Sequence, residues 1–292
     1  MKKLLEGGLR TRGVIKLSTP DQPLLSVITV VYNGAGHVER AFESVFNQSY
    51  TNIEYIIVDG GSSDGTIEMI RSHDNTIDYW VSEPDNGIYD AMNKGIKVSK
   101  GELIGFLNSD DYYEPETIME VIKVYLETGC RGIFFGNSLV IQGDLGIRYI
   151  SIGNATLWRG LGFKHQAMFV HRYVHEKFGL YNTAYRIAAD YDFVMNVVSK
   201  GVRLIHIDKC LVNYSNTGIS GINRIETLNE LRVISKNHYG LFSLSFLGFM
   251  AVYIRSYLFQ GVGRLVHVTF GEKALLVVRA IYTRLKHNRS KV

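Results

Sequence analysis

Two stretches of this chain place carboxylates where they could hold a charged ligand. The first, Asn108-Ser109-Asp110-Asp111, directly follows an apolar run at residues 103–107. That run has the scarcity of polar side chains expected of a strand covered on both faces. Open α/β sheets bind their ligands at the carboxyl ends of such strands. A solvated turn is the alternative, because Glu114-Pro115-Glu116 is typical of a helix start.

The second stretch is the loop that begins at Asp59. This acid ends a β-branched run at residues 52–58 and precedes Gly60 and Gly61. Capping of the following helix explains Asp64, but a carboxylate directly before two glycines caps nothing. Small residues at this position would let the backbone approach a ligand closely. The sequence therefore indicates a binding loop here.

Further polar residues lie at the ends of expected elements. Asp190 and Asp192 open a helix, where the helix dipole favours acids and accounts for one of the pair. His165 and Gln166 stand at the entry to a strand, and a lone histidine there is more often structural than catalytic. Lys94 could meet a phosphate from its helix, although a solvated lysine is the commoner case.

The elements that position these side chains alternate between strands and helices over the first half. Apolar β-branched runs predict strands, and apolar residues recurring every three or four positions predict helices. The expected strands are 24–31, 52–58, 78–82, 102–108 and 132–135, and the expected helices are 37–48, 66–72, 88–98 and 117–127. Such alternation argues for an α/β fold with a parallel sheet and helices on both faces. Gly34-Ala35-Gly36 is no dinucleotide fingerprint, since Glu39 stands at the third glycine.

The pattern changes in the second half of the chain. Residues 137–152 alternate irregularly with glycines, which suggests a β-hairpin or meander. The remaining expected elements are strands at 164–170, 203–208 and 211–214 and a helix at 187–200.

Composition narrows the class of protein. The chain has 292 residues, 46% of them hydrophobic, which suffices for one large core with an appendage. Cys130 and Cys210 lie far apart without metal-ligand spacing, so no disulfide framework or zinc site is expected. Lys2 and Lys3 are not followed by the apolar region of a signal peptide. These features predict a cytoplasmic protein.

The positive charge is concentrated at the C-terminal end. Residues 241–292 contain eight Lys or Arg and one acid, and the rest of the chain is mildly acidic. A nucleic-acid binder usually carries its charge on the folded domain, so no nucleic-acid partner is expected. The apolar run at 241–254 is interrupted by Arg255 before the ~20 residues that a membrane-spanning helix needs. An apolar helix followed by a basic amphipathic one suits attachment to an anionic membrane surface, and packing on the domain or dimerisation is the alternative.

Taken together, these motifs resemble those of the family 2 glycosyltransferases, which have the GT-A nucleotide-sugar-binding fold. The resemblance covers residues 26–220, roughly two thirds of the chain. The residues that carry it are 26–33 (SVITVVYN), 48–50 (QSY), 58–66 (VDGGSSDGT), 93–96 (NKGI), 107–111 (LNSDD) and 189–192 (ADYD). Each motif alone is weak, but the six in this order and spacing are specific.

The resemblance implies a role for most of the residues singled out above. It places Asp59, Tyr32 and Asn33 around the nucleotide base, with Asn93 and Lys94 also on the donor side. It makes Asp110 the metal-binding acid of an Asp-x-Asp motif whose first position is Asn108 here. A hard Mg²⁺ or Mn²⁺ held by one carboxylate, the donor diphosphate and water is the cofactor that such a site implies.

The resemblance also implies the chemistry. Asp190 matches the catalytic base, in a motif whose Glu position is Ala189 here. Such a base removes the proton of an acceptor hydroxyl in an inverting displacement, while the metal stabilises the leaving diphosphate. His165, Gln166 and Asp192 fall where family members contact acceptor or diphosphate.

We therefore expect a transferase that moves a sugar from a nucleotide-diphosphate donor, a UDP-sugar by family habit, to a saccharide or lipid-linked saccharide. Its expected setting is surface polysaccharide assembly at the inner face of the cell membrane, and a homo-oligomer is compatible with this. A non-catalytic nucleotide-sugar-binding scaffold is one alternative. A sugar nucleotidyltransferase is the other, although residues 33–37 fit its Gly-rich triphosphate loop poorly.

The expected organisation has three parts. Residues 1–22 form a basic, loosely ordered arm, and residues 23–240 form the GT-A domain. Within that domain, 23–136 is the nucleotide-binding half and 137–240 the acceptor half. Residues 241–292 form the apolar and basic helical tail that associates with the membrane.

Overall fold

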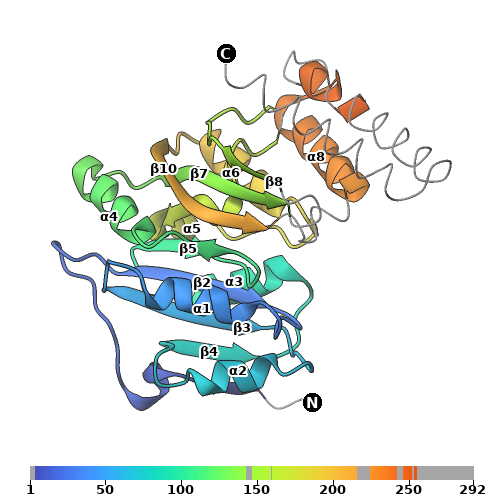
Figure 1. Cartoon of the computed structure of the whole chain (residues 1–292). Helices are drawn as coiled ribbons and strands as arrows, with labels where there is room; N and C mark the ends of the chain where they lie inside the picture. Colours follow the sequence, from blue (N-terminus) through green and yellow to red (C-terminus); the bar gives the residue numbers. More distant parts are fainter. Residues whose placement is uncertain are drawn as a thin grey trace.

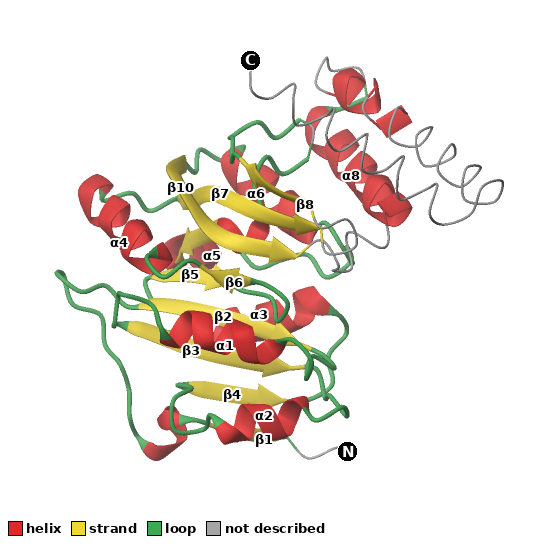
Figure 2. Ribbon diagram, in the orientation of Figure 1, coloured by secondary structure: helices red, strands yellow, loops and turns green. Residues whose placement is uncertain are grey.

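A single twisted sheet of ten strands runs through the protein, and helices cover both of its faces (Figures 1 and 2). The strands follow the order β1-β4-β3-β2-β5-β9-β7-β10-β6, with β8 paired to β7.

The structure is a computed structural model that describes residues 4–142, 147–158, 160–215, 224–241, 246–251 and 253–254. Its strands are β1 (Leu5–Gly7), β2 (Leu25–Val31), β3 (Ile53–Asp59), β4 (Tyr79–Ser82), β5 (Leu103–Phe106), β6 (Tyr112–Tyr113), β7 (Ile133–Gln142), β8 (Ile147–Ser151), β9 (Met168–His171) and β10 (Leu204–Ser215). Its α-helices are α1 (Val38–Phe46), α2 (Thr66–Ser72), α3 (Ile88–Val98), α4 (Thr117–Thr128), α5 (Arg172–Phe178), α6 (Ala189–Val198) and α8 (Arg224–Tyr239).

The first half has the parallel arrangement expected from the sequence. Strand β2 pairs in parallel with both β3 and β5, and β3 pairs in parallel with β4. All seven residues of β2 and all seven of β3 are buried, because helices cover both sides. Side chains of α1, α2 and α4 share one core with alternate strand residues, and those of α3, α5 and α6 share the core on the opposite face. This is the period-2 alternation of a two-sided sheet.

The second half adds antiparallel strands, so the sheet as a whole is mixed. Strand β9 lies antiparallel between β5 and β7, and it joins the two halves by backbone hydrogen bonds. Strands β7 and β8 form the expected hairpin. The two strands predicted at 203–208 and 211–214 are one strand, β10, because irregularities near Cys210 bend it without ending its pairing with β7.

The prediction of a loosely ordered N-terminal arm is wrong for the described residues. Strand β1 pairs with β4, and a 3-10 helix (Leu9–Arg12) follows it. Arg10 then bonds to Glu54 at 3.1 Å and Lys16 to Asp78 at 2.9 Å. The side chains of Glu54 and Asp78 are 4% and 3% exposed, and buried carboxylates need charged or hydrogen-bonding partners. The basic residues of the arm order it by supplying them.

The described C-terminal residues pack on the domain. Helix α8 contacts α6, and Phe246 and Phe249 beyond it are 6% and 1% exposed. A Cβ on Gly248 would lie 2.9 Å from the Trp158 ring, so this segment lies directly against the domain. None of the helices in the described part of the chain is long and apolar enough to cross a membrane. The expected amphipathic helix of the tail lies outside the described residues.

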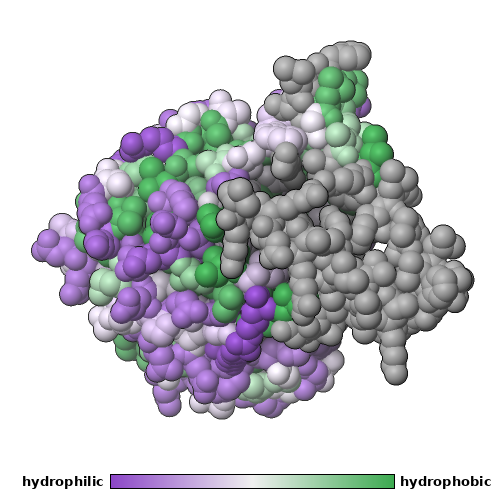
Figure 3. Space-filling model, turned by 45° about the horizontal axis from the view of Figure 1, so that its top comes forward, coloured by the Kyte–Doolittle hydropathy of each residue, from purple (hydrophilic) through white to green (hydrophobic). Residues whose placement is uncertain are grey.

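The surface of the α/β body has no single character on the face seen in Figure 3, where hydrophilic and hydrophobic side chains are interspersed. Leu247 and Ile254, in the described C-terminal segment, are 54% and 52% exposed. Isolated apolar side chains are normal on protein surfaces, so these two alone identify no binding face.

Candidate active site

Three loops meet at one edge of the sheet, as the parallel pairing of β2 with β3 and β5 requires. They follow the carboxyl ends of these strands and contain residues 32–37, 60–65 and 107–111. A Cβ on Gly34 would lie 2.5 Å from Val31 Cγ2 and 3.3 Å from Ser109 Oγ. The loops after β2 and β5 thus approach so closely that a side chain at residue 34 would separate them. This edge is where open α/β sheets hold ligands.

Asp59 is completely buried and organises its own loop. Its Oδ2 accepts hydrogen bonds from the N–H groups of Gly61 and Ser62, at 3.0 Å each, and from the Ser82 hydroxyl at 2.6 Å. Its Oδ1 accepts the Ser62 hydroxyl at 2.5 Å. A carboxylate accepts about four hydrogen bonds, and Asp59 already accepts four from the protein. In this conformation it therefore stabilises the loop. Direct recognition of a base by Asp59 stays a prediction.

Tyr32 and Asn33 lie at the same edge. Asn33 adopts a left-handed conformation with φ 50°, and its Oδ1 accepts the N–H of Ser63 at 3.0 Å. Its own N–H donates to the Ser62 hydroxyl at 2.7 Å. Asn33 therefore joins the loop after β2 to the loop after β3. The Tyr32 side chain is 67% exposed at this junction and is available to contact a ligand.

The acids after β5 are desolvated and incompletely paired. Burial raises the pKa of Asp110, and the nearby His37 acts in the opposite direction. Burial and the charge of Asp110 raise the pKa of Asp111 well above its usual range. Asp111 Oδ1 accepts the N–H of Ser215 at 2.7 Å, so this acid supports the turn. Its Oδ2 and the Oδ1 of Asn108 are buried without any hydrogen-bond partner.

These oxygens suit a hard divalent cation. Carboxylate and amide oxygens are what Mg²⁺ and Mn²⁺ prefer, and unpartnered buried oxygens next to a desolvated carboxylate would gain from a positive charge. Within the described ranges no three His, Cys, Asp or Glu side chains group in a way that could hold a metal ion. Asp110 and Asn108 would therefore share the cation with donor phosphate and water.

Asp190 lies at the start of α6 and is held in place by a buried tyrosine. The Tyr89 hydroxyl lies 3.0 Å from Asp190 Oδ1 and 2.8 Å from the carbonyl oxygen of Ile187, so its single proton is shared between these two acceptors. Burial first, and the Asp190 charge second, raise the pKa of Tyr89 well above its usual range, which keeps it protonated. The Tyr191 N–H donates to the same Oδ1 at 2.9 Å. Both of these contacts use Oδ1 of Asp190.

His165 and Tyr181 connect Asp190 to the centre of the sheet. His165 stacks on Phe106 of β5, and its Nε2 lies 3.3 Å from the Tyr181 hydroxyl. Burial lowers the pKa of His165, and the charge of Asp190 opposes this. The backbone of Tyr181 is held by Asn93, which donates to its carbonyl at 2.9 Å and accepts from its N–H at 3.0 Å. Asn93 thus anchors the segment before α6.

The remaining predicted residues lie apart from these contacts. Lys94 is 2.8 Å from Glu83 and also donates to the Pro84 carbonyl at 3.1 Å, so its charge is already compensated by the protein. Asp192 pairs with His238 of α8 at 3.1 Å. Gln166 is 6% exposed within a 3-10 helix (His165–Ala167). Phosphate or acceptor contacts of these three stay predictions.

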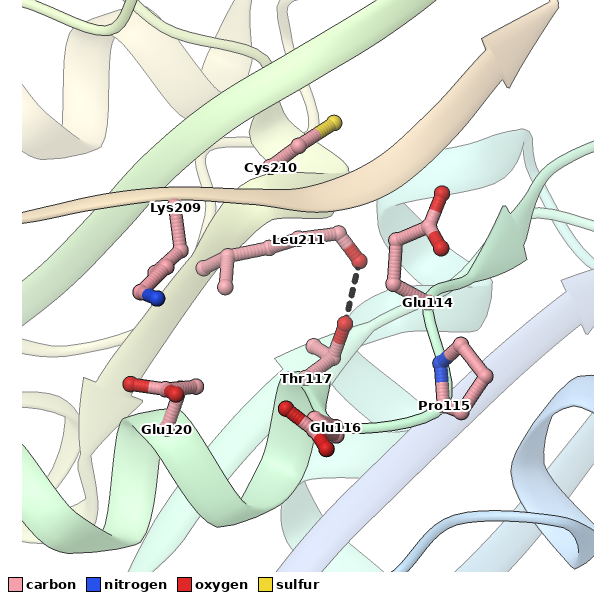
Figure 4. A pocket seen from close by; sticks show the side chains of 8 residues that line it. All are labelled: Glu114, Pro115, Glu116, Thr117, Glu120, Lys209, Cys210 and Leu211. Atoms are coloured by element: carbon pink, nitrogen blue, oxygen red, sulfur yellow. Dashed lines mark hydrogen bonds between the residues drawn. The ribbon is translucent and has the colours of Figure 1, made fainter.

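The sequence missed residues that complete the site. Tyr89 could have been found, since it lies one helical turn before Asn93 on the face that α3 buries. Tyr181 had no such signal, because only the fold brings it against Phe193 of α6. A cavity of about 360 Å³ between α4 and β10 is lined by none of the predicted site residues (Figure 4). Its lining residues are Glu114, Pro115, Glu116, Thr117, Glu120, Lys209, Cys210 and Leu211.

Solved structures confirm the GT-A fold. A crystal structure of S. aureus TarS in complex with UDP-GlcNAc superposes with a TM-score of 0.61 at 17% identity, covering 79% of this chain and 71% of that chain. Mannosyltransferase PcManGT from Pyrobaculum calidifontis, in complex with GDP-Man and Mn²⁺, superposes with a TM-score of 0.58 at 16% identity, covering 94% and 92%. At such identities the likeness establishes the fold alone.

Relatives in sequence point to the same class. An uncharacterised glycosyltransferase of Rickettsia felis is 32% identical over 71% of this chain, which spans 36% of that protein's length. The hyaluronan synthase of Pasteurella multocida is 29% identical over 74% of this chain, which spans 22% of that protein. A PGL/p-HBAD biosynthesis glycosyltransferase of Mycobacterium bovis is 31% identical over 59% of this chain and 68% of its own length.

The family model described as "Glycosyl transferase family 2" matches residues 26–187. This range is more than half of the chain and contains the three loops at the sheet edge as well as His165. Asp190 lies three residues beyond it. The chain belongs to glycosyl transferase family 2, as its motifs predicted.

Proposed function

We propose that this protein is an inverting glycosyltransferase that transfers a sugar from a nucleotide-diphosphate donor, a UDP-sugar, to a hydroxyl of a saccharide or lipid-linked saccharide in surface polysaccharide assembly. The observation that carries the proposal is the pairing of β5 with β9. This pairing brings His165, which precedes β9, against Phe106 of β5, and the charge of Asp190 acts on the pKa of the same histidine. The acid proposed for the donor side thus follows β5, and the base proposed for the acceptor side lies at the start of α6, near a histidine that packs on β5.

In this reaction Asp190 accepts the proton of the acceptor hydroxyl while that oxygen attacks the anomeric carbon of the donor sugar. The bond from the anomeric carbon to the diphosphate oxygen breaks in the same step, and the nucleoside diphosphate leaves with that electron pair. Attack from the side opposite the leaving group inverts the anomeric centre. Tyr89 binds Oδ1 of the Asp190 carboxylate, and we assign the accepted proton to Oδ2.

The donor side is supplied by the loops after β2, β3 and β5. Asp110 and Asn108 would hold a divalent cation whose chemistry, when bound, is to stabilise charge on the leaving diphosphate. Asp59 and Asn33 keep the 60–65 loop in shape, and Tyr32 offers an exposed ring beside it. A UDP-sugar is proposed because TarS was crystallised with UDP and with UDP-GlcNAc. PcManGT was crystallised with GDP-Man, which makes GDP-mannose the competing donor.

A screen of nucleotide sugars tests the proposal. UDP-GlcNAc, UDP-glucose and GDP-mannose, each with Mn²⁺, are compared by thermal shift and by release of the nucleoside diphosphate. We expect a UDP-sugar to raise the Tm, since a ligand bound only to the folded state stabilises it by mass action, and to be slowly hydrolysed. Stabilisation without any hydrolysis or transfer would favour a non-catalytic sugar-nucleotide-binding protein. Release of pyrophosphate from UTP and a sugar phosphate would favour a nucleotidyltransferase.

We also propose that residues 255–292 attach the protein to the inner, anionic face of the cell membrane. The support is compositional, since this range holds all eight basic residues of the tail and a single acid. The test is sedimentation with vesicles containing about 30% anionic lipid, for the full chain and for a chain ending at residue 254, which keeps the packed Phe249. We expect the shorter chain to lose most of its binding. Equal binding of both would refute the attachment.

A further inference from the structure

Helix α6 begins without a cap of its own. Ala188 occupies the N-cap position and provides no side-chain hydrogen bond. The first N–H groups of a helix have no intrahelical partner and are usually satisfied by a nearby polar side chain. Because Asp190 lies in this first turn, the way in which these groups are satisfied determines where its carboxylate stands.

The N-cap residue Ala188 and the two residues before it are instead bound by a side chain of another helix, 42 to 44 residues later. Glu230 of α8 accepts the Arg186 N–H at 2.7 Å with Oε1. Its Oε2 accepts the N–H groups of Ile187 at 3.0 Å and Ala188 at 2.9 Å. One carboxylate thus binds three consecutive N–H groups immediately before the helix. Charge-assisted bonds of this kind are stronger than neutral ones, and a negative charge is favoured at a helix N-terminus.

The same short segment is held from the opposite side by Tyr89. The Tyr89 hydroxyl contacts the Ile187 carbonyl and Asp190 Oδ1. The backbone of Ile187 is therefore bound at its N–H by Glu230, and its carbonyl oxygen shares the Tyr89 hydroxyl proton with Asp190. Between them the two side chains fix the backbone that leads into Asp190 and the carboxylate itself.

The position of Glu230 is in turn fixed by the packing of α8. Residues 230, 234, 235 and 238 lie on one face of this helix, as their spacing of three to four requires. Ile234 is completely buried in the core shared with α6, and the Ser235 hydroxyl lies 3.3 Å from the Tyr191 hydroxyl. His238 lies 3.1 Å from Asp192. Helix α8 and the first two turns of α6 therefore form one packed unit.

We propose that Glu230 is a positioning residue for the transfer reaction, acting through the Arg186–Ala188 backbone to hold Asp190 in its working place. The proposal rests on the role of Asp190 given above and extends the active site to α8, which lies outside the matched family range. It assigns no contact between Glu230 and substrate.

The test compares E230Q with E226Q in the full chain. Glutamine keeps the size of the side chain but loses the charge, and its NH₂ group faces an N–H that needs an acceptor. Glu226 lies one turn earlier on α8 and is exposed, so E226Q makes the same chemical change away from α6. For each protein, kcat and KM are measured for UDP-GlcNAc with Mn²⁺, the Tm is recorded, and hydrogen exchange is followed in peptides covering residues 185–190.

We expect E230Q to lower kcat by about 10- to 100-fold with the donor KM within two-fold of wild type, because small displacements of a reacting group cost this much. The amides of residues 186–188 should exchange faster, and E226Q should match wild type throughout. An unchanged kcat in E230Q, or a fall in kcat no larger than the loss of folded protein, would overturn the proposal. E230D, which keeps the charge and shortens the side chain, replaces E230Q if that variant does not fold.

The exchange measurement separates this proposal from the proposed function. If the wild-type protein does not turn over UDP-GlcNAc, exchange at residues 186–188 decides the positioning role alone, and unchanged exchange in E230Q overturns it. If D190N keeps full activity, the assignment of the base fails, whatever E230Q does to the exchange of the segment.

Discussion

Replacing Asp190 with asparagine should lower turnover by about 10²-fold or more and leave donor affinity unchanged. Asparagine has the size of aspartate, and its carbonyl oxygen can still accept the Tyr89 hydroxyl, so the start of α6 should keep its structure. What is lost is a group able to take a proton from the acceptor hydroxyl. The measurement is kcat for transfer or donor hydrolysis, together with the affinity for UDP by calorimetry.

The matched comparison is D192N, which also tests the predicted acceptor or diphosphate contact of Asp192. Asp192 lies in the same helical turn, but its carboxylate pairs with His238 of α8. We expect this variant to lose no more than a few-fold in kcat, with a small decrease in Tm because the contact with α8 weakens. Near-normal turnover of D190N would remove Asp190 from the role of base, and equal losses in both variants would point to a structural effect.

Replacing Asp110 with asparagine should abolish metal-stimulated turnover and at the same time stabilise the metal-free protein. Burial raises the pKa of Asp110, which means that folding disfavours its ionised form. The unfolded state releases this proton more easily, so the penalty grows as pH rises above about 4 and is complete above the raised pKa. Asparagine removes this penalty, so the Tm of the metal-free protein should rise.

The measurements are the Tm with and without Mn²⁺ and UDP, and the rate of donor turnover as a function of Mn²⁺ concentration. Wild type should gain Tm on adding both ligands, and this gain should diminish as pH falls, because a protonated carboxyl is a poor ligand. D110N should show no such gain. D21N, a matched change at an exposed acid far from the loops, should behave as wild type. Metal-stimulated turnover that survives in D110N would refute the metal role.

The sequence predicted the helices and strands well where the local pattern of apolar residues matches the burial that the fold imposes. Helix α2 was predicted at residues 66–72, where the structure has it, and the parallel strands of the first half fall within about a residue or two of their predicted ends. Buried strands and amphipathic helices leave strong periodic signals, because one-sided or two-sided burial selects residue types directly. Asp59 and Asp110 could be identified because each lies at or just after the end of a buried strand whose apolar run is easily recognised.

The features that the sequence did not predict are pairings between distant residues. The N-terminal arm is ordered by ion pairs with Glu54 and Asp78. Glu54 lies in β3 and Asp78 directly before β4, and neither residue was predicted to contact the arm. Asn93 belongs to a motif that was predicted to lie on the donor side, yet both of its hydrogen bonds anchor Tyr181, 88 positions away. Glu230 lies in α8, a helix of low amphipathicity, and the residues around it in the sequence do not indicate that it contacts α6. Such contacts are decided by the fold and leave no local periodicity.

The pairing of β5 with β9 also limits how this enzyme can move. Leu103, Ile104 and Gly105 pair directly with His171, Val170 and Phe169, and a Cβ on Gly105 would lie 2.5 Å from the Phe169 ring. Enzymes that close two lobes over a substrate need a junction that bends, and a hydrogen-bonded, tightly packed strand pair is not one. Moving the donor side toward the acceptor side would break the hydrogen bonds between β5 and β9 in the middle of the sheet. We therefore expect substrate entry and product release to depend on the loops along the sheet edge, while the two halves of the sheet keep their relative position.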